Sequence, residues 1–249
     1  MAKFVLYDQL VLVDDYDITG DTNAVALEYG AELKDCSVLQ NDTRVNIGGL
    51  KTVQCSVSGF YDADTQDAEL FANVGVSDKP VSIINDGDAE GDIAYFFNAV
   101  GGEYSIGSAI GEVMPFSLVA GAQGNLVRGV MGHNARTTAE TATGNSAGVQ
   151  LGAVTANQKL YAVLHVLESN GSGDQTLDVV VESDDNSGFT SATTRLTATQ
   201  VTTSTTSESL EVAGAITDDY FRVNFTIAGS GSPSFKFVHW IVTGKRLVW

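Results

Sequence analysis

The sequence predicts a mainly β protein with two domains: an N-terminal antiparallel β-sandwich or barrel-like domain with one packed α-helix, and a C-terminal β-sandwich domain. The composition is the first reason, because 26 glycines against 3 prolines, together with frequent Val, Thr and Ser, favour strands joined by glycine turns. Short alternating segments separated by glycines are the second reason, and the third is that one segment alone has convincing helical spacing. Hydrophobic residues make up 43% of the chain. This is enough for packed cores, but no apolar run is long enough to cross a membrane, so we expect no membrane partner.

The first domain is expected to be organised around residues 46–76. Residues 51–58 alternate between apolar and polar side chains, which is typical of a strand with one buried face. Acidic residues that suit a helix start then precede a helix predicted over residues 63–74, which has one apolar face. A single helix with one apolar face is expected to pack on a sheet. The core predicted from this stretch consists of Val53, Cys55, Val57, Leu70, Phe71 and Val74.

The rest of the first domain is predicted as short strands. A first strand over residues 4–13 leads to an acidic turn, and a second strand covers residues 24–29. Residues 34–50 are polar and glycine-ended, and they form a long loop for a compact domain. Further strands are expected over residues 81–84, 93–100, 104–106, 113–119 and 126–130.

A loss of apolar periodicity over residues 132–148 predicts the domain boundary. The two domains are therefore expected to cover residues 1–146 and 147–249. Beyond the boundary, the number and spacing of the predicted strands are those of a β-sandwich. These strands are expected over residues 159–167, 176–181, 193–200, 207–212, 220–227 and 235–242.

No motif predicts catalysis, a metal site or a cofactor, and we expect a protein that is not an enzyme. The sequence lacks a nucleophile elbow, a phosphate loop, an HExxH motif and a CxxC spacing. The acidic run over residues 86–92 begins like a calcium loop. However, its twelfth position is Phe97 where a glutamate is needed, so an acidic hairpin tip is the better interpretation. Cys36 and Cys55 are the only cysteines, and reduced thiols are expected.

The charge is acidic and unevenly distributed. The chain carries a formal net charge of −18. Residues 1–146 hold 21 acids and 7 bases, which gives −14, and residues 147–249 hold 10 acids and 6 bases, which gives −4. Such a surface repels phosphates and anionic lipids, so ordinary nucleic-acid binding is not expected.

The first domain contains, in this order, Gly49-Leu50-Lys51, Ser58-Gly59-Phe60 and the segment of residues 67–74. Together these three segments resemble the tail tube (major tail) proteins of long-tailed, siphovirus-type bacteriophages. Residues 215–223 resemble the C-terminal half of larger tail proteins of this kind. The resemblance implies a virion structural protein, made in the host cytoplasm, that forms hexameric rings. These rings stack into a tube that contacts other tail proteins and lets DNA pass without specific binding. The first domain would form the ring and the second would project outward.

Under this hypothesis, the loop over residues 34–50 is a candidate arm that reaches the next ring, and the apolar C-terminus is expected to dock on a neighbour. The candidate inter-ring contacts are Arg44, Asn46, Leu50 and Trp249. The candidate acids lining the lumen are Asp14, Asp15, Asp17, Asp86, Asp88, Glu90 and Asp92.

A different class of function also fits the sequence: a virion decoration or adhesin-like protein whose C-terminal sandwich binds glycans. Aromatic rings can stack on sugar faces, and the second half contains many of them. Four of them, Phe221, Phe225, Phe235 and Phe237, alternate with polar residues along strands, however, so a role in the core is the better interpretation. The aromatic residues in question are Tyr161, Phe189, Tyr220, Phe221, Phe225, Phe235, Phe237 and Trp240.

Overall fold

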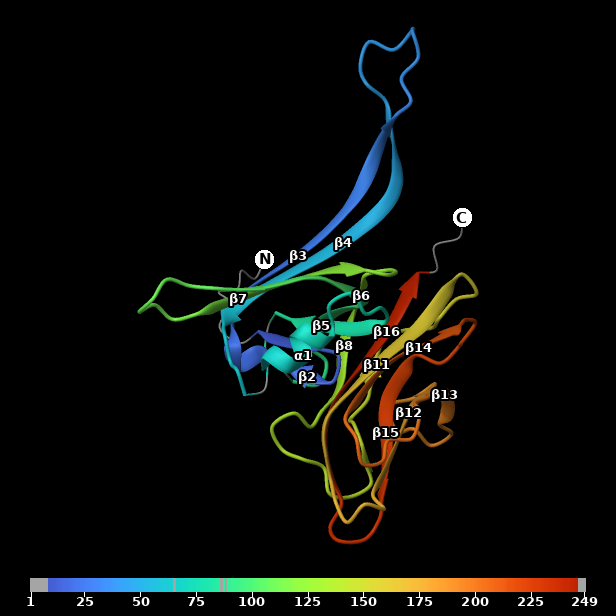
Figure 1. The fold of residues 1–249 in the computed structure, drawn as a ribbon. Coiled ribbons are helices and arrows are strands. Elements are labelled where there is room, and N and C mark those ends of the chain that lie inside the picture. The colour runs from blue at the N-terminus through green and yellow to red at the C-terminus, as the bar shows by residue number, and fades with distance from the viewer. Residues whose placement is uncertain (1–8, 65, 86, 88, 246–249) are drawn as a thin grey trace. The chain divides into compact units, whose positions relative to one another are not determined.

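The computed structural model describes residues 9–64, 66–85, 87 and 89–245. Strands dominate it, the sheets are antiparallel and sandwich-like, and α1 (Gln66–Ala72) is the one α-helix of the described residues, so the predicted fold class is confirmed. The chain divides into two compact units (Figure 1). Unit 1 comprises residues 1–20, 80–97 and 127–249, and unit 2 comprises residues 21–79 and 98–126.

Unit 1 contains two antiparallel sheets. The larger has the strand order β14-β11-β16-β8-β6-β5-β1-β2, and the smaller has the order β10-β15-β12-β13 with β9 paired to β15. The short 3-10 turn η1 (Thr19–Asp21) follows β2. The strands of the larger sheet are β1 (Leu10–Val13), β2 (Tyr16–Asp17), β5 (Lys79–Ile84), β6 (Ile93–Ile106), β8 (Val127–Asn134), β11 (Gln158–Asn170), β14 (Thr206–Ala213) and β16 (Ser234–Lys245). Those of the smaller sheet are β9 (Gly144–Asn145), β10 (Val149–Gln150), β12 (Thr176–Asp184), β13 (Thr193–Thr197) and β15 (Tyr220–Ala228).

Strands β11 and β16 have apolar residues on both faces, because each face of their sheet packs against a core. Leu164 belongs to a cluster that includes Val179 and Phe225 of the smaller sheet. Val163, its neighbour in the chain, belongs to a second cluster on the other face, with Trp240. These near-continuous apolar runs are what a strand buried on both faces requires.

Unit 2 is a four-stranded antiparallel sheet with α1 on one face. Its strands are β3 (Thr22–Asp35), β4 (Asn46–Phe60), β7 (Pro115–Ala122) and the second half of β6, paired in the order β3-β4-β7-β6. Leu70 of α1 is fully buried. The Tyr104 hydroxyl of β6 donates a hydrogen bond to the Asp67 carboxylate of α1 over 2.9 Å. Gly101 allows α1 to approach this sheet, since an added Cβ would lie 2.3 Å from the Asn73 carbonyl oxygen.

Two predictions about the helix are wrong for the single chain: Phe71 and Val74 do not lie in the core. They are 72% and 43% exposed. The buried residues of this segment are Gln66, Leu70 and Asn73, which are spaced four and three apart on one helical face. Phe71 lies about 100° around the helix from Leu70, and α1 ends at Ala72, before Val74.

The two units divide the chain differently from the predicted boundary after residue 146. Strand β8 precedes that boundary, yet it pairs with β16, and Val238 lies opposite Asn134. The long loop predicted over residues 34–50 is shorter in the structure and covers residues 36–45, because β3 extends to Asp35 and β4 begins at Asn46. Among the described residues, no helix has both the length and the apolar character that crossing a membrane requires.

The burial of α1 makes a prediction about stability. Leu70→Ala should lower the free energy of unfolding by about 2–5 kcal/mol, because it leaves a cavity under α1. Phe71→Ala is the matched control on the same helix, and it should cost less than about 1 kcal/mol in the monomer, because its ring is mostly in solvent. Urea unfolding followed by circular dichroism checks both values. Equal losses for the two variants would contradict the packing described here.

Candidate functional site

One face of the unit 2 sheet is open and polar. Along β4, Val53, Cys55 and Val57 are buried on the α1 side, so the residues between them lie on the opposite face. Burial raises the pKa of the Cys55 thiol to about 12, which leaves it protonated and unreactive near neutral pH. The strand register then fixes which residues of β3, β7 and β6 share the opposite face. The open face consists of Ala24, Ala26, Glu28, Gln54, Ser56, Ser58, Val100, Glu103, Ser105, Ser117, Val119 and Gly121.

The chemistry of the open face is uniform. Its residues are exposed or half-buried, and most are small or carry a hydroxyl or amide group. Glu28 and Glu103 are its two charged residues, and it contains no lysine, arginine or aromatic ring. This face therefore offers no cation to a phosphate group and no ring on which a base could stack.

A long arm extends from the same sheet. Strand β4 pairs with β7 only from Gln54 onward, whereas its earlier residues pair with β3 alone. The arm, defined as residues 30–51, therefore continues beyond the four-stranded part of unit 2 (Figure 1). Its tip is closed by hydrogen bonds, including Cys36 N–H to the Val45 carbonyl over 2.8 Å and Val38 N–H to the Asn41 side-chain oxygen over 2.7 Å. The arm thus has a defined tip.

Exposed apolar residues and bases are concentrated on this arm. Leu39 at the tip is 107% exposed, and the Arg44 side chain is 85% exposed, with its Nε 3.8 Å from an Asp35 carboxylate oxygen. The other large exposed apolar residues of the arm are Leu33, Val38, Val45, Ile47 and Leu50. An exposed apolar strand pair is a liability for a free monomer and suits a partner surface.

The structure places three of the predicted inter-ring residues, Arg44, Asn46 and Leu50, on the exposed arm. Trp249 lies outside the described residues. Cys36 is a free, exposed thiol on the arm, and Cys55 is free and buried.

The predicted lumen acids are not brought together on the open face. Asp86 and Asp88 lie outside the described residues, and the other five belong to unit 1. Four of these acids make contacts within unit 1, three of them with side chains. An Asp17 oxygen lies 2.9 Å from the Arg136 guanidinium, a Glu90 oxygen lies 2.9 Å from His133 Nδ1, and Asp14 accepts a hydrogen bond from the Ser207 hydroxyl. Asp92 accepts a hydrogen bond from the backbone of Ala89, and Asp15 is half-buried.

Sequence reasoning missed Glu28 and Glu103. Glu28 lies opposite Gln54, and Glu103 lies opposite Val119, which in turn lies opposite Ser56. The alternation of polar residues over 54–58 indicates in the sequence that β4 has a polar face. The sequence does not indicate which residues of β3, β6 and β7 lie on the same face, because that depends on how the strands pair.

His165 and His239, two of the three buried histidines of unit 1, lie fully inside the core and out of contact with solvent. His165 Nδ1 donates to the Asp14 carbonyl, and the Ser82 hydroxyl lies 2.7 Å from its Nε2. Burial lowers the pKa of His165 to about 4. Burial and the nearby His133 and His165 lower the pKa of His239 to about 3. Both imidazoles are therefore neutral near pH 7 and serve as packed core groups.

The aromatic residues of the second half also belong mainly to the core. Phe221, Phe225, Phe235, Phe237 and Trp240 are buried. Their rings are not available to stack on a sugar, so the glycan-binding alternative loses the feature that suggested it.

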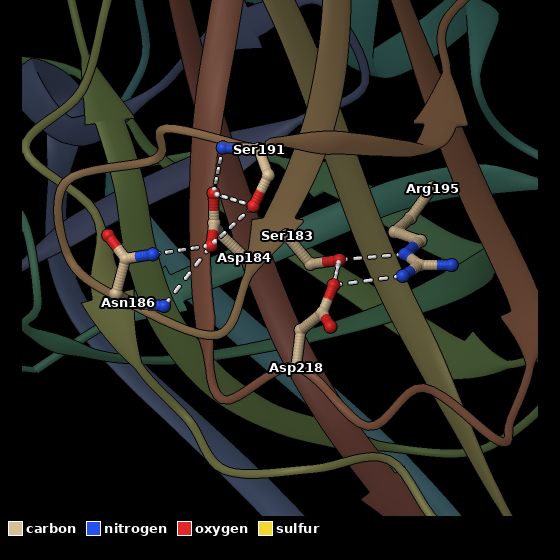
Figure 2. A network of polar contacts seen from close by, with 6 residues as sticks. All are labelled: Ser183, Asp184, Asn186, Ser191, Arg195 and Asp218. Carbon is tan, nitrogen blue, oxygen red and sulfur yellow. Dashed lines mark hydrogen bonds and ion pairs between the residues drawn. The ribbon is translucent and has the colours of Figure 1, made fainter.

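A polar network in unit 1 was a further candidate site (Figure 2). The Ser183 hydroxyl donates to an Asp218 oxygen over 2.6 Å and accepts from Arg195 Nε over 2.7 Å, while Arg195 Nη2 lies 2.9 Å from the same Asp218 oxygen. No histidine belongs to the network, so the serine has no general base of the kind a hydrolase uses.

The rest of the network holds a turn in place. Asp184 accepts hydrogen bonds from the backbone N–H groups of Asn186 and Ser191, over 3.2 and 2.8 Å. The contacts in Figure 2 therefore join β12, β13 and the segment after β14, and we assign the network a structural role.

This role makes a pH-dependent prediction. The hydrogen bond from Ser183, and then Arg195, lower the pKa of Asp218, so its contribution to stability is present above the unfolded pKa of about 3.9 and is lost as pH falls through the folded pKa. Asp218→Asn should cost about 1–3 kcal/mol at pH 7. The difference from the unsubstituted protein should shrink as pH falls below about 4. Urea unfolding across this pH range measures it, and a difference that stays constant would refute the assignment.

No protein-family model and no curated protein matches the sequence. Among solved structures, the chain is similar to a tail protein of an empty gene transfer agent particle with C6 symmetry, at 16% identity over 47% of this chain and 92% of that one, with a TM-score of 0.38. It is also similar to a chain of the PVC sheath–tube complex, an extracellular contractile injection system in its extended state. That match has 13% identity over 51% of this chain and 92% of the other, with a TM-score of 0.39.

A third similar structure covers more of the chain. It is the Dit protein of phage SPP1, described as a hub of the adsorption apparatus in phages that infect Gram-positive bacteria. The identity is 12% over 95% of this chain and 99% of that one, with a TM-score of 0.38. Similarity at this level does not establish a shared function.

Proposed function

We propose that this chain is a virion structural protein, the tail tube subunit of a long-tailed bacteriophage, and that its copies form stacked rings around a DNA conduit. The observation that carries the proposal is the open face of unit 2, an exposed four-stranded surface with two glutamates and no base. The resemblance of residues 49–51, 58–60 and 67–74 to tail tube proteins supports the same function. The proposal needs no catalytic residue, metal or cofactor.

The open face suits a wall along which DNA slides. A cationic side chain that meets a phosphate releases counterions, and several together make a strong non-specific site. A face of hydroxyls, small residues and carboxylates offers no such contact and keeps cations and water between itself and the duplex. Under this proposal, Glu28 and Glu103 line the lumen, and Asp15 and Asp92 remain further candidates.

The arm supports the self-association that the proposal requires. Its exposed apolar residues need a partner, and Arg44, Asn46 and Leu50 lie among them. We propose that the arm contacts the next ring and that Trp249 contributes a second contact between copies. Other tail proteins would bind the ends of such a tube.

The proposal predicts a specific response to charge reversal on the open face. Concentrated protein should form rings or tubes with a central channel in negative-stain images. It should show no measurable affinity for duplex DNA at about 0.15 M salt, where the Debye length is about 8 Å. Tubes of the double variant Glu28→Lys/Glu103→Lys should retain DNA, with a steep salt dependence.

The control is Glu112→Lys, which makes the same substitution as each half of the double variant, a charge change of +2 against +4, at an exposed position outside the open face. It should leave DNA retention near the level of the unsubstituted protein. Particles without a channel, or micromolar DNA binding by the unsubstituted protein, would overturn the proposal.

A further inference from the structure

Unit 2 has an exposed apolar surface on the outer side of α1 and of the turn that follows it. We call Phe71, Val74 and Val76 the α1 patch; all three are exposed, Phe71 most of all. The backbone under the patch is fixed, because Gly75 N–H donates to the Gly101 carbonyl over 2.8 Å and Val74 bridges to Gly101 of β6. The patch is therefore a preformed surface.

The surroundings of the α1 patch are acidic. The sequence contains no lysine or arginine from Thr52 to Asp78. Residues 61–76 carry four acids and no base, a net charge of −4. These acids are Asp62, Asp64, Asp67 and Glu69.

The arm is less acidic and carries most of the bases of unit 2. Residues 30–51 hold three bases and three acids, a net charge of zero. Unit 2 contains four bases in all, and Lys34, Arg44 and Lys51 of the arm are three of them. The tip adds Val38 and Leu39, which are among the most exposed apolar residues of the unit. The arm therefore combines an apolar tip with bases, which residues 61–76 lack.

Within one chain, neither the arm tip nor the α1 patch is covered by the other, because the residues of both surfaces are exposed there. An arm tip that faces an α1 patch pairs apolar residues with apolar residues, and it brings the exposed Arg44 side chain to the acids of residues 61–76. The contact joins two different surfaces of the same chain, which makes it heterologous and able to repeat from copy to copy.

We infer that the arm tip of one copy docks on the α1 patch of a second copy. Val38 and Leu39 pack against Phe71, Val74 and Val76, and Arg44 faces the acids of α1. The inference rests on the proposed function, because it requires the copies to associate with one another. It adds which surface of the neighbouring copy the arm binds.

Cysteine cross-linking between two variants tests the docking. In a Cys36→Ser background, one chain carries Leu39→Cys and the other carries Phe71→Cys. The full-length chains are mixed and oxidised, and disulfide-linked dimers are measured on non-reducing gels. Dimers should form mainly in the mixture and should be lost on reduction. The matched control replaces Phe71→Cys by Ile110→Cys, an apolar position on the loop between β6 and β7 that is more exposed than Phe71, and should yield few dimers with Leu39→Cys.

Equal cross-linking to positions 71 and 110, or cross-linking between two Leu39→Cys chains alone, would overturn the docking. If the unsubstituted protein forms rings or tubes but no 39–71 cross-link appears, the docking is wrong and the proposed function stands. If the unsubstituted protein does not assemble at any concentration, both are wrong.

A charge swap tests the electrostatic part separately. Arg44→Glu should reduce the assembled fraction in sedimentation velocity, because it places a carboxylate against the acids of α1. Glu69→Lys alone should also reduce it. The double variant Arg44→Glu/Glu69→Lys should recover assembly, since each contact again joins opposite charges, and this recovery shows that the single variants still fold. Failure of the double variant to recover would overturn the pairing of Arg44 with α1.

Discussion

The alternation of side chains along β4 is the constraint on which the rest of unit 2 depends. Val53, Cys55 and Val57 are buried towards α1, and because a strand has a period of two, Gln54, Ser56 and Ser58 must lie on the other face. A slip of one residue in register would exchange the two faces. The helix contact and the open face are therefore two consequences of one register.

The same pairing explains why the two faces differ so strongly in chemistry. On the α1 side, Leu118 and Phe116 of β7 continue the apolar layer of β4. On the other side, the register aligns carboxylates, hydroxyls and small residues from four strands. Beyond the point where β7 stops pairing, β3 and β4 have only each other, and their apolar residues remain exposed on the arm. One sheet thus provides both a face that offers no cation to DNA phosphates and an arm whose exposed apolar residues suit a partner surface.

The local parts of this fold could be predicted from the sequence, whereas the parts that depend on pairing between distant segments could not. The buried side of β4 follows from alternation over eight residues. The buried stripe of α1 was harder to predict, because it contains Gln66 and Asn73 beside Leu70, and apolar character alone pointed to Phe71. The contact of Asp67 with Tyr104 and the close approach at Gly101 explain why this polar stripe faces the sheet.

The candidate site shows the same limit. Arg44 and Leu50 could be expected on an arm because they lie in a long polar segment, whereas Glu28 and Glu103 join the open face only through the register. A cryo-EM reconstruction of the assembled protein at side-chain resolution is the most direct test of the tube function. If the open face lines a DNA conduit, the assembly will have a central channel with Glu28 and Glu103 facing it and no lysine or arginine at that height. An assembly in which the open face is buried between subunits, or in which bases line the channel, would contradict this function.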